Sequence, residues 1–344
     1  MTGGEETGGE ESSREGNVVP PPGATRQRVA AIDCGTNSIR LLVADVDPVR
    51  RTLTDLDRRL EIVRLGQGVD KTGRLAPEAL QRTLTALGGY ARIIDESQVD
   101  AVRMVATSAT RDASNAAEFT QGVVEVLGVA PEVLSGDEEA RLSFAGATAE
   151  FGSHQQPPPP PYLVLDIGGG STEFVLGSTD KPGGLAREVA AISMNIGCVR
   201  MTERHLHSDP PEQEEIAAAV EDIDAAVATA AEKVPIAQAN SLIGLAGSVT
   251  TVAAIVLDLP EYDSSRIHHT KITAAQVRTV TSMLLAQTRA ERAKIPSMHP
   301  GRVDVIGAGS LVLDRVMRRF GFDEVVVSEH DILDGIAWSM ATAR

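Results

Sequence analysis

The sequence predicts an α/β protein that is built from two halves with mixed β-sheets. Three observations support this fold class. The chain has 344 residues, about twice the length of a typical single domain. Short β-branched and aliphatic runs alternate along it with longer segments of helical periodicity. A polar segment that contains glycine and lies between two strand-like runs occurs twice, 133 residues apart.

The first half begins with an acidic tail. Residues 1–27 are rich in glutamate, glycine and serine, so we expect them to be disordered. Two β-branched runs around a polar turn then predict a hairpin. A helix is predicted after Pro77, because Leu80, Leu84 and Leu87 have helical spacing. Acidic residues further along are typical of the first turn of another helix. In order, we expect strands at 28–32 and 39–46, a helix at 77–94, a strand at 102–106, a helix capped by Ser114 and ending near 127, and a helix from 136 to about 151.

The second half follows the prolines of the Pro157–Pro161 run, which we expect to form a stiff polyproline II spacer, either an exposed loop or the start of a second domain. Aliphatic runs around a glycine turn predict a second hairpin, and Ala-rich segments predict long helices. We expect strands at 162–165 and 173–176, helices at 212–232 and 274–287, a strand at 243–246 joined by a glycine turn to a helix at 248–257, and a final strand at 324–328 and helix at 332–343.

Composition limits the function classes. Aromatic residues make up only 3% of the chain against 42% apolar residues, so the core must be aliphatic. The net charge of −16 argues against a nucleic-acid partner held by bulk electrostatics. Two cysteines exclude a disulfide scaffold and fit a reducing cytoplasm. Without a secretory signal or a run of about 20 apolar residues, we expect a cytoplasmic protein with no membrane partner.

The repeated segment carries the chemistry. Asp33 to Leu42 aligns with Asp166 to Val175, and Asp, Gly and Ser occupy the same three offsets. Glycines let backbone N–H groups approach an anion, and hydroxyls add donors. The leading aspartates can hold a hydrated divalent cation that neutralises phosphate charge. A single such hairpin could be an ordinary tight turn, but two facing hairpins would clamp a phosphate chain between the halves. Neither segment is a Rossmann or P-loop fingerprint.

The duplicated hairpin resembles the hallmark of the actin, sugar-kinase and heat-shock ATPase superfold. Four ordered motifs narrow the resemblance, and these are Asp33-Cys-Gly-Thr-Asn-Ser-Ile-Arg40, Ala106-Thr-Ser-Ala-Thr-Arg111, Ser135-Gly-Asp-Glu-Glu-Ala-Arg141 and Asp166-Ile-Gly-Gly-Gly-Ser-Thr-Glu173. Over about residues 28–343 they resemble the short, two-domain form of the exopolyphosphatase/guanosine pentaphosphate phosphohydrolase (Ppx/GppA) family. This resemblance implies actin-like domains at 28–142 and 143–330 around an interdomain cleft, with a C-terminal helix at about 331–344 that packs back on the first.

The resemblance also implies an activity: Mg²⁺-dependent, processive hydrolysis of the terminal phosphoanhydride of inorganic polyphosphate, which releases orthophosphate. Mn²⁺ is an alternative metal. Glu139 would orient or deprotonate the attacking water, Arg111 would face the substrate, and Asp166 and Glu173 would hold the metal, with Asp33 as a further candidate. The expected phosphate-binding residues are Gly35, Thr36, Asn37, Ser38, Arg40, Gly168, Gly169, Gly170 and Ser171. Phosphoryl transfer needs positioning, charge neutralisation and an in-line water, which these residue types supply.

Other functions remain open at this stage. The same fold can hydrolyse the 5′-phosphate of guanosine pentaphosphate (pppGpp), an activity of the stringent response. A sugar or acyl kinase and a non-catalytic nucleotide-binding or filament protein are more remote alternatives. We expect a homodimer, because dimers are common in the family.

Some residues are expected to have no part in the chemistry. Cys34 is interpreted as a small apolar filler. His268, His269 and His299 lack a metal-ligand pattern in the sequence and are taken as ordinary polar residues. The basic cluster of Arg315, Arg318 and Arg319 is interpreted as a solvated helix face.

Overall fold

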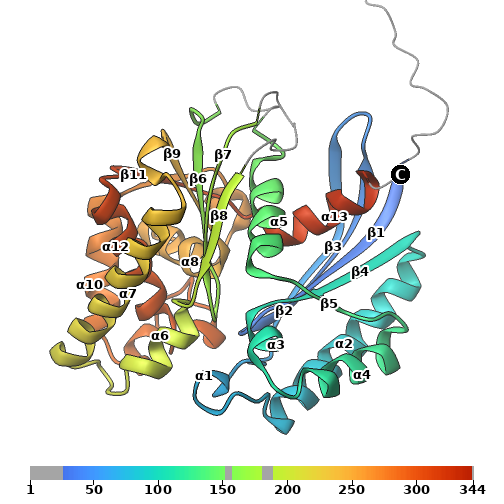
Figure 1. Cartoon of the computed structure of the whole chain (residues 1–344), viewed down its shortest axis with the longest axis horizontal. Coiled ribbons are helices and arrows are strands. Elements are labelled where there is room, and N and C mark those ends of the chain that lie inside the picture. The colour runs from blue at the N-terminus through green and yellow to red at the C-terminus, as the bar shows by residue number, and fades with distance from the viewer. Residues whose placement is uncertain (1–25, 152–156, 180–188, 343–344) are drawn as a thin grey trace, which may run out of the picture.

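The computed structural model describes residues 26–151, 157–179 and 189–342. It has two mixed β-sheets that lie side by side with two helices, α5 and α13, between them (Figure 1). The predicted α/β class with mixed sheets in two halves is therefore confirmed. Residues 1–25 of the acidic tail lie outside the described residues, but the expected end of the tail at residue 27 is wrong, because Gln27 is the first residue of β1 (Gln27–Cys34). Within the described ranges, no helix is long and apolar enough to cross a membrane.

The two sheets share a common topology over five strands. In each, three antiparallel strands are followed by two strands that run parallel to the first, so the duplication extends well beyond the hairpin. The second sheet has one extra edge strand, Lys271–Thr273, which runs antiparallel to its neighbour. The first sheet has the order β3-β2-β1-β4-β5, from β1 (Gln27–Cys34), β2 (Ser38–Asp47), β3 (Thr52–Ile62), β4 (Ala101–Ala106) and β5 (Glu132–Val133). The second has the order β10-β11-β9-β6-β7-β8, from β6 (Tyr162–Ile167), β7 (Thr172–Gly177), β8 (Val189–Met194), β9 (Ser241–Leu245), β10 (Lys271–Thr273) and β11 (Glu324–Val327).

Helices cover both faces of each sheet. The first half contains α1 (Val69–Thr72), α2 (Pro77–Ser97), α3 (Ser108–Asp112), α4 (Ala116–Leu127) and α5 (Gly136–Thr148). The second contains α6 (Cys198–His205), α7 (Gln213–Lys233), α8 (Ala246–Val256), α9 (Ser264–Ile267), α10 (Ala274–Ala286), α11 (Arg289–Arg292), α12 (Ile306–Phe320) and α13 (Ile332–Thr342), with short 3₁₀ turns at Ile236–Gln238 and Pro300–Arg302. Aliphatic side chains fill each interface between helix and sheet, as the low aromatic content predicts.

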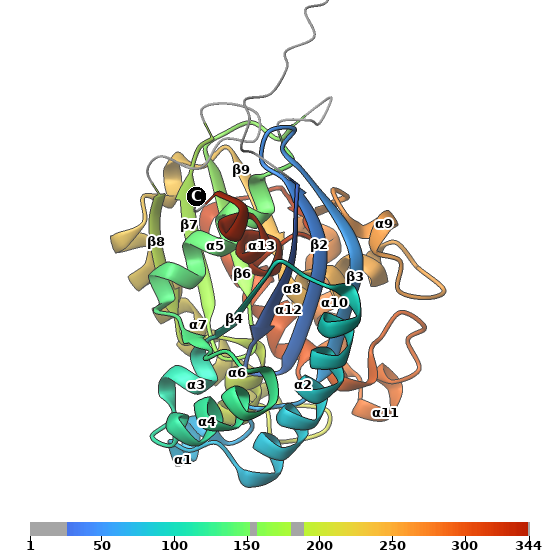
Figure 2. The same cartoon turned by 90° about the vertical axis from the view of Figure 1, so that its right-hand side faces the viewer.

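The two helices between the sheets are also the two chain connections between the halves. α5 leads from β5 to β6, and α13 follows β11 but packs against β1 and β2. Figure 2 shows α5 and α13 crossing next to each other. The crossing is close, because a Cβ at Gly146 would lie 1.8 Å from the carbonyl oxygen of Asp331, and one at Gly335 would lie 2.0 Å from that of Leu142. The expected boundary between residues 142 and 143 falls inside α5.

Several local predictions are wrong. Ser114 does not cap α4; the N-cap is Asn115, and the Ser114 hydroxyl donates to the Gly73 carbonyl at 2.9 Å instead. No glycine turn separates β9 from its helix, because Ala246 begins α8 directly with a positive φ of 63°. The Pro157–Pro161 run leads directly into β6 and lies against the start of β9, where Ser241 donates to the Pro159 carbonyl at 2.8 Å. The expectation of a stiff polyproline II spacer stays a prediction.

Candidate active site

The two repeated turns have the same geometry. In the first, the Gly35 amide donates to the Ser38 carbonyl at 2.9 Å, and in the second, the Gly168 amide donates to the Ser171 carbonyl at 3.0 Å. Asp33 lies directly opposite Arg40 across β1 and β2, as Asp166 lies opposite Glu173 across β6 and β7. Directly opposed residues project from the same face of a sheet. Each hairpin therefore presents one pair of charged side chains beside its turn.

The N-terminus of α6 orients the second turn. The amides of Cys198 and Val199 donate to the carbonyls of Gly168 and Gly169 at 2.9 and 2.8 Å. The Gly197 amide donates to the Gly170 carbonyl. A Cβ at Gly197 would lie 2.4 Å from the backbone of the turn, so a larger residue would not fit at this position. In a trans peptide the following N–H points the opposite way. The amides of Gly169, Gly170 and Ser171 therefore point away from α6, and an anion could accept hydrogen bonds from them.

The first turn is oriented in the same way by the segment after β3. The Thr36 carbonyl accepts from the Gly66 amide at 2.8 Å, and the Asn37 carbonyl accepts from the Arg64 amide at 2.9 Å. The amides of Asn37 and Ser38 consequently point away from that segment.

The two turns touch across the boundary between the halves. A Cβ at Gly169 would lie 2.9 Å from Cβ of Thr36, and one at Gly170 would lie 2.5 Å from Oγ of Ser108. Thr36 and Ser108 are themselves hydrogen-bonded through their hydroxyls at 2.9 Å. Glycine is required at both positions because any side chain would push the halves apart.

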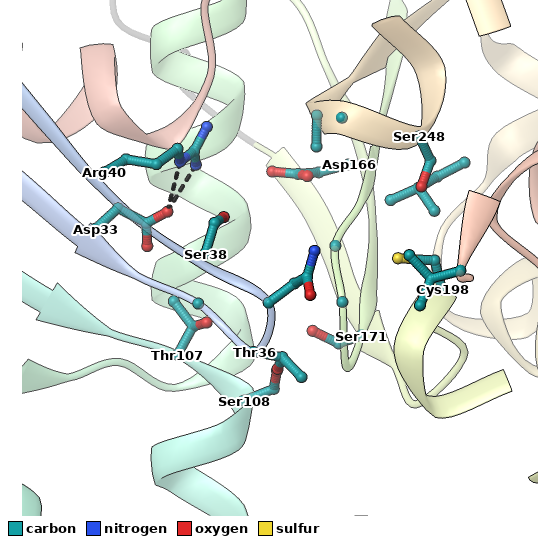
Figure 3. A pocket seen from close by; sticks show the side chains of 18 of the residues that line it. Asp33, Thr36, Ser38, Arg40, Thr107, Ser108, Asp166, Ser171, Cys198 and Ser248 are labelled. Carbon is teal, nitrogen blue, oxygen red and sulfur yellow. Dashed lines mark hydrogen bonds and ion pairs between the residues drawn. The ribbon is translucent and has the colours of Figure 1, made fainter. Parts of the chain in front are cut away.

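A cavity of about 100 Å³ lies between the turns (Figure 3). The predicted site residues that line it are Asp33, Gly35, Thr36, Asn37, Ser38, Arg40, Glu139, Asp166, Gly168, Gly169 and Ser171. The other predicted residues, Arg111, Gly170 and Glu173, do not line it but adjoin residues that do.

Arg40 supplies positive charge at the first turn. Its guanidinium binds Asp33 at 2.6 Å (Figure 3) and also pairs with Asp331, which lies just before α13. Burial raises the pKa of Asp33, and the nearby Arg40 opposes this shift. The second carboxylate oxygen of Asp33, Oδ1, is buried and accepts no hydrogen bond within the described part of the chain. An unpaired buried oxygen of this kind is suited to a cation.

Glu139 and Glu138 have different environments although they are adjacent. Glu138 is exposed and closes a capping box with Ser135, whose amide donates to its carboxylate at 2.9 Å. Glu139 is only 8% exposed and accepts from Arg111 at 3.1 Å. Burial raises the pKa of Glu139 to about 7; the charge of Arg111 opposes the shift, whereas those of nearby Asp166 and Asp33 add to it. Glu139 therefore has the pKa of a group that can exchange a proton near neutrality.

The carboxylates of the second hairpin are buried together. Asp166 accepts from Ser143 at 2.7 Å, and Glu173 accepts from Ser193 at 2.7 Å. Burial raises the pKa of Asp166 to about 6 and that of Glu173 well above its ordinary range, and the neighbouring carboxylates contribute. A divalent cation that prefers oxygen ligands would relieve this repulsion. The residues present therefore fit such an ion, with Asp166 and Asp33 facing the cavity and Glu173 adjoining Asp166.

Sequence reasoning missed several lining residues. Thr107 and Ser108, at the start of α3, and Ser248, in α8, bring hydroxyl groups to the cavity. Arg302 reaches it from the 3₁₀ turn before α12 and donates to the Gly247 carbonyl at 3.0 Å. Thr107 and Ser108 belong to one of the motifs that carry the family resemblance, but nothing in the local pattern marks any of these residues as binding groups.

Arg200 on α6 joins the second turn to the first half. Its Nε donates to the Gly170 carbonyl at 2.7 Å, and its guanidinium pairs with Asp112 at 2.5 Å and with Asp70. Arg204, one helical turn later, also binds Asp70 at 2.7 Å. This set of ion pairs holds α6 against α1 and α3 and thereby keeps the two turns facing each other.

The structure also places the residues that were expected to have no part in the chemistry. Cys34 is fully buried, which fits an apolar filler, and burial raises the pKa of its thiol. Arg315 pairs with Asp224 at 2.5 Å and Arg318 pairs with Asp314 at 2.7 Å, away from the cavity lining. His268, in contrast, is not an isolated polar residue, because it lies with Glu150 and His330 in one group of potential metal ligands.

Comparisons with known proteins agree with this architecture. The family model described as "Ppx/GppA phosphatase family" matches residues 42–343. Exopolyphosphatase 2 of Mycobacterium tuberculosis H37Rv is 48% identical over 325 residues, which cover 91% of this chain and 98% of that protein. The crystal structure of an exopolyphosphatase-like protein has a TM-score of 0.86 at 44% identity, covering 92% of this chain and 98% of that one. The Ppx/GppA family member of Aquifex aeolicus has a TM-score of 0.76 at 31% identity, covering 93% and 99%. This chain, with its two actin-like halves, belongs to the Ppx/GppA phosphatase family.

Proposed function

We propose that this protein is an exopolyphosphatase that hydrolyses the terminal phosphoanhydride of inorganic polyphosphate and releases orthophosphate. The observation that carries the proposal is the cavity between the two turns, which is lined by turn residues from both halves together with buried carboxylates. Its volume of about 100 Å³ suits one terminal phosphate rather than a whole nucleotide. A relative that is 48% identical carries the name exopolyphosphatase 2, which adds support.

Substrate binding begins with the terminal phosphate. Its oxygens would accept from the turn amides around Asn37, Ser38 and Ser171 and from the guanidinium of Arg40. Asp166 and Glu173 would hold Mg²⁺, with Mn²⁺ as an alternative ion, and Asp33 is a further candidate ligand. When bound, such an ion neutralises phosphate charge and stabilises the leaving oxygen.

Glu139 would act on the water. It sits in the first turn of α5 at the wall of the cavity, and its raised pKa suits a group that takes a proton as the water attacks. Arg111 would fix the carboxylate, because it donates to both Glu139 and the Leu134 carbonyl. We also propose two domains, residues 28–142 and 143–330, with the C-terminal helix packed on the first. Closure of these domains would exclude bulk water from the reaction.

A second cavity gives the rest of the substrate a place. It has a volume of about 530 Å³ and adjoins the first, with Arg40, Gly247 and Arg302 lining both. Arg58 and Arg59 of β3 also line it and are paired with Asp334 and Asp57. The acidic residues Glu329 and Asp331 lie in the same wall. A polyphosphate chain could lie along these arginines and advance one residue after each cleavage, which would make hydrolysis processive. Such local charge is needed because the whole protein has a net charge of −16.

The same second cavity favours one alternative, hydrolysis of pppGpp. Tyr262, Met298 and Pro300 line it, and these side chains offer surfaces on which a guanine base could pack. That activity would link the protein to the stringent response.

Phosphate release from polyphosphate, from pppGpp, and from ATP with and without sugars, each with and without Mg²⁺, tests the proposal. Mg²⁺-dependent release from polyphosphate alone is expected. Faster release from pppGpp would support the alternative, and transfer to a sugar would overturn both. We also propose a homodimer, which light scattering of the purified protein would test.

A further inference from the structure

Three side chains from separate segments meet beside the two connections between the halves. Glu150 follows the end of α5, and His330 lies between β11 and α13, so these two residues belong to the two connections. His268 joins them from the residue after α9 in the second half. All three side chains are partly buried, and one potential ligand atom from each lies within 4.8 Å of the others.

The contacts within this group are short. Nε2 of His268 lies 3.2 Å from one carboxylate oxygen of Glu150, and Nδ1 of His330 lies 3.3 Å from the other. The two imidazole rings are 4.6 Å apart between centroids. Each histidine therefore directs a ring nitrogen at the same carboxylate.

We propose that Glu150, His268 and His330 form a second metal site, which takes a divalent ion of the zinc class and is separate from the carboxylates between the turns. A tetrahedral ion with ligand bonds of about 2.0–2.1 Å places neighbouring ligand atoms roughly 3.3 Å apart. In the structure, one potential ligand atom from each residue lies within 4.8 Å of the others, so the side chains would draw together slightly around the ion. The separations of 3.2 and 3.3 Å join the two histidines to the two different oxygens of Glu150. Three protein ligands leave the fourth position to water.

The choice of metal follows from the donor atoms. Two imidazole nitrogens and one carboxylate oxygen suit Zn²⁺, Co²⁺ or Ni²⁺, whereas Mg²⁺ prefers oxygen ligands alone. The site between the turns offers carboxylates instead, so the two sites should select different ions. This difference makes them separable by experiment.

The hydrogen bond on the other nitrogen of His268 gives the proposal a specific consequence. The Glu329 amide donates to Nδ1 of His268 at 3.1 Å, so in this state Nε2 carries the ring proton and donates it to Glu150. A metal on Nε2 requires that proton to move to Nδ1. The Glu329 amide would then lose its acceptor, and its hydrogen exchange should become faster when the metal binds.

The position of the site suggests what a bound ion would do. Asp331 directly follows His330 and pairs with Arg40, which in turn pairs with Asp33 at the first turn. An ion held by Glu150 and His330 would fix the two connections to each other beside this chain of ion pairs. It would therefore stabilise one arrangement of the halves.

Cobalt titration of the full-length protein tests the proposal. After treatment with a chelator, the protein is placed in excess Mg²⁺, which occupies the oxygen-rich site, and Co²⁺ is added. Tetrahedral Co²⁺ absorbs visible light strongly, whereas Co²⁺ surrounded by six oxygens absorbs weakly. We expect one equivalent of strongly absorbing Co²⁺ that Zn²⁺ displaces, together with faster exchange of the Glu329 amide.

Variants assign the signal to these residues. His268→Gln and His330→Gln should each weaken Co²⁺ binding by more than about 100-fold, since each removes a ligand. His205→Gln is the matched control, because His205 bonds Asp222 at 2.9 Å but belongs to no group of three potential metal ligands among the described residues; this variant should bind Co²⁺ like the wild type. Circular dichroism checks that each variant folds. The proposal is wrong if the wild type binds no Co²⁺ or Zn²⁺ stoichiometrically in excess Mg²⁺, a result that depends on no variant, or if both histidine variants keep the absorption.

Discussion

Replacing Glu139 by Gln should lower turnover and raise the stability of the metal-free protein. As the group that accepts the proton of the water, Glu139 should be worth roughly 10²–10⁴-fold in turnover. As a buried carboxylate beside Asp166 and Asp33, it should also cost folding free energy whenever it is ionised. Gln has a similar shape and no charge, so it removes both properties at once.

The magnitude follows from the pKa. Burial raises the pKa of Glu139 from 4.5 to about 7, a shift that corresponds to about 3 kcal/mol at most. The folded state then binds the proton more tightly than the unfolded state, so stability falls as the pH rises from about 4.5 to about 7 and stays low above that. This pKa already includes the attraction of Arg111, which opposes the effect of burial. At pH 8 without metal, we expect Glu139→Gln to be more stable by about 1–3 kcal/mol.

Two measurements and one control check this expectation. Phosphate release from polyphosphate in Mg²⁺ gives turnover, and denaturant unfolding with chelator at pH 5 and pH 8 gives stability. The gain should be present at pH 8 and nearly absent at pH 5. Glu138→Gln is the matched control, because Glu138 is exposed and closes the capping box; it should leave turnover intact and slightly lower the melting temperature.

A purely structural role of Glu139 at the start of α5 would give a different result. If Glu139 only stabilises the N-terminus of α5, Glu139→Gln would lose about 0.3–1 kcal/mol and keep its turnover. Lost turnover combined with lost stability would refute the electrostatic reasoning, and a larger loss of turnover in Glu138→Gln would show that the wrong glutamate was chosen.

Three further predictions concern the metal, the tail and the contact between the halves. Asp166→Asn and Glu173→Gln should each lose turnover and Mg²⁺ affinity, and full activity of both variants at low Mg²⁺ would contradict the metal assignment. Deletion of residues 1–27 should change turnover by less than about twofold, whereas a large gain that disappears at high salt would indicate autoinhibition by the acidic tail. Asp70→Asn removes the partner of Arg200 and Arg204 and should raise KM by up to about fivefold with little change in kcat; Asp224→Asn, which breaks an ion pair within the second half, should change neither.

The sequence predicted the two turns well because their determinants are local. Glycine, aspartate and serine at fixed offsets specify a turn between two strands, and the structure repeats even the hydrogen bond that closes it. The third strand of each sheet was not predicted. β3 (Thr52–Ile62) is an edge strand with many charged side chains, and its charge hides the alternation that identifies a half-buried strand.

Groups assembled from distant segments could not be predicted in this way. Glu150, His268 and His330 come from segments up to 180 residues apart, and no spacing rule connects them. The same holds for Arg302, which reaches the cavity because the turn before α12 packs beside α8. Asn115 replaced Ser114 as the cap of α4 through a shift of one residue, which residue preferences alone do not resolve.

The two hairpins differ at one charged position, where the first has Arg40 and the second has Glu173. This difference gives the two repeated turns different binding properties. In the first, Asp33 faces Arg40, so the pair is neutral overall. In the second, Asp166 faces Glu173, so the pair carries two negative charges when ionised. A cation should therefore be held more strongly beside the second turn, while the phosphate oxygens nearest the first turn meet a guanidinium. The duplication supplies two sets of amides, and the single exchange of Arg for Glu gives the site a metal side and an arginine side.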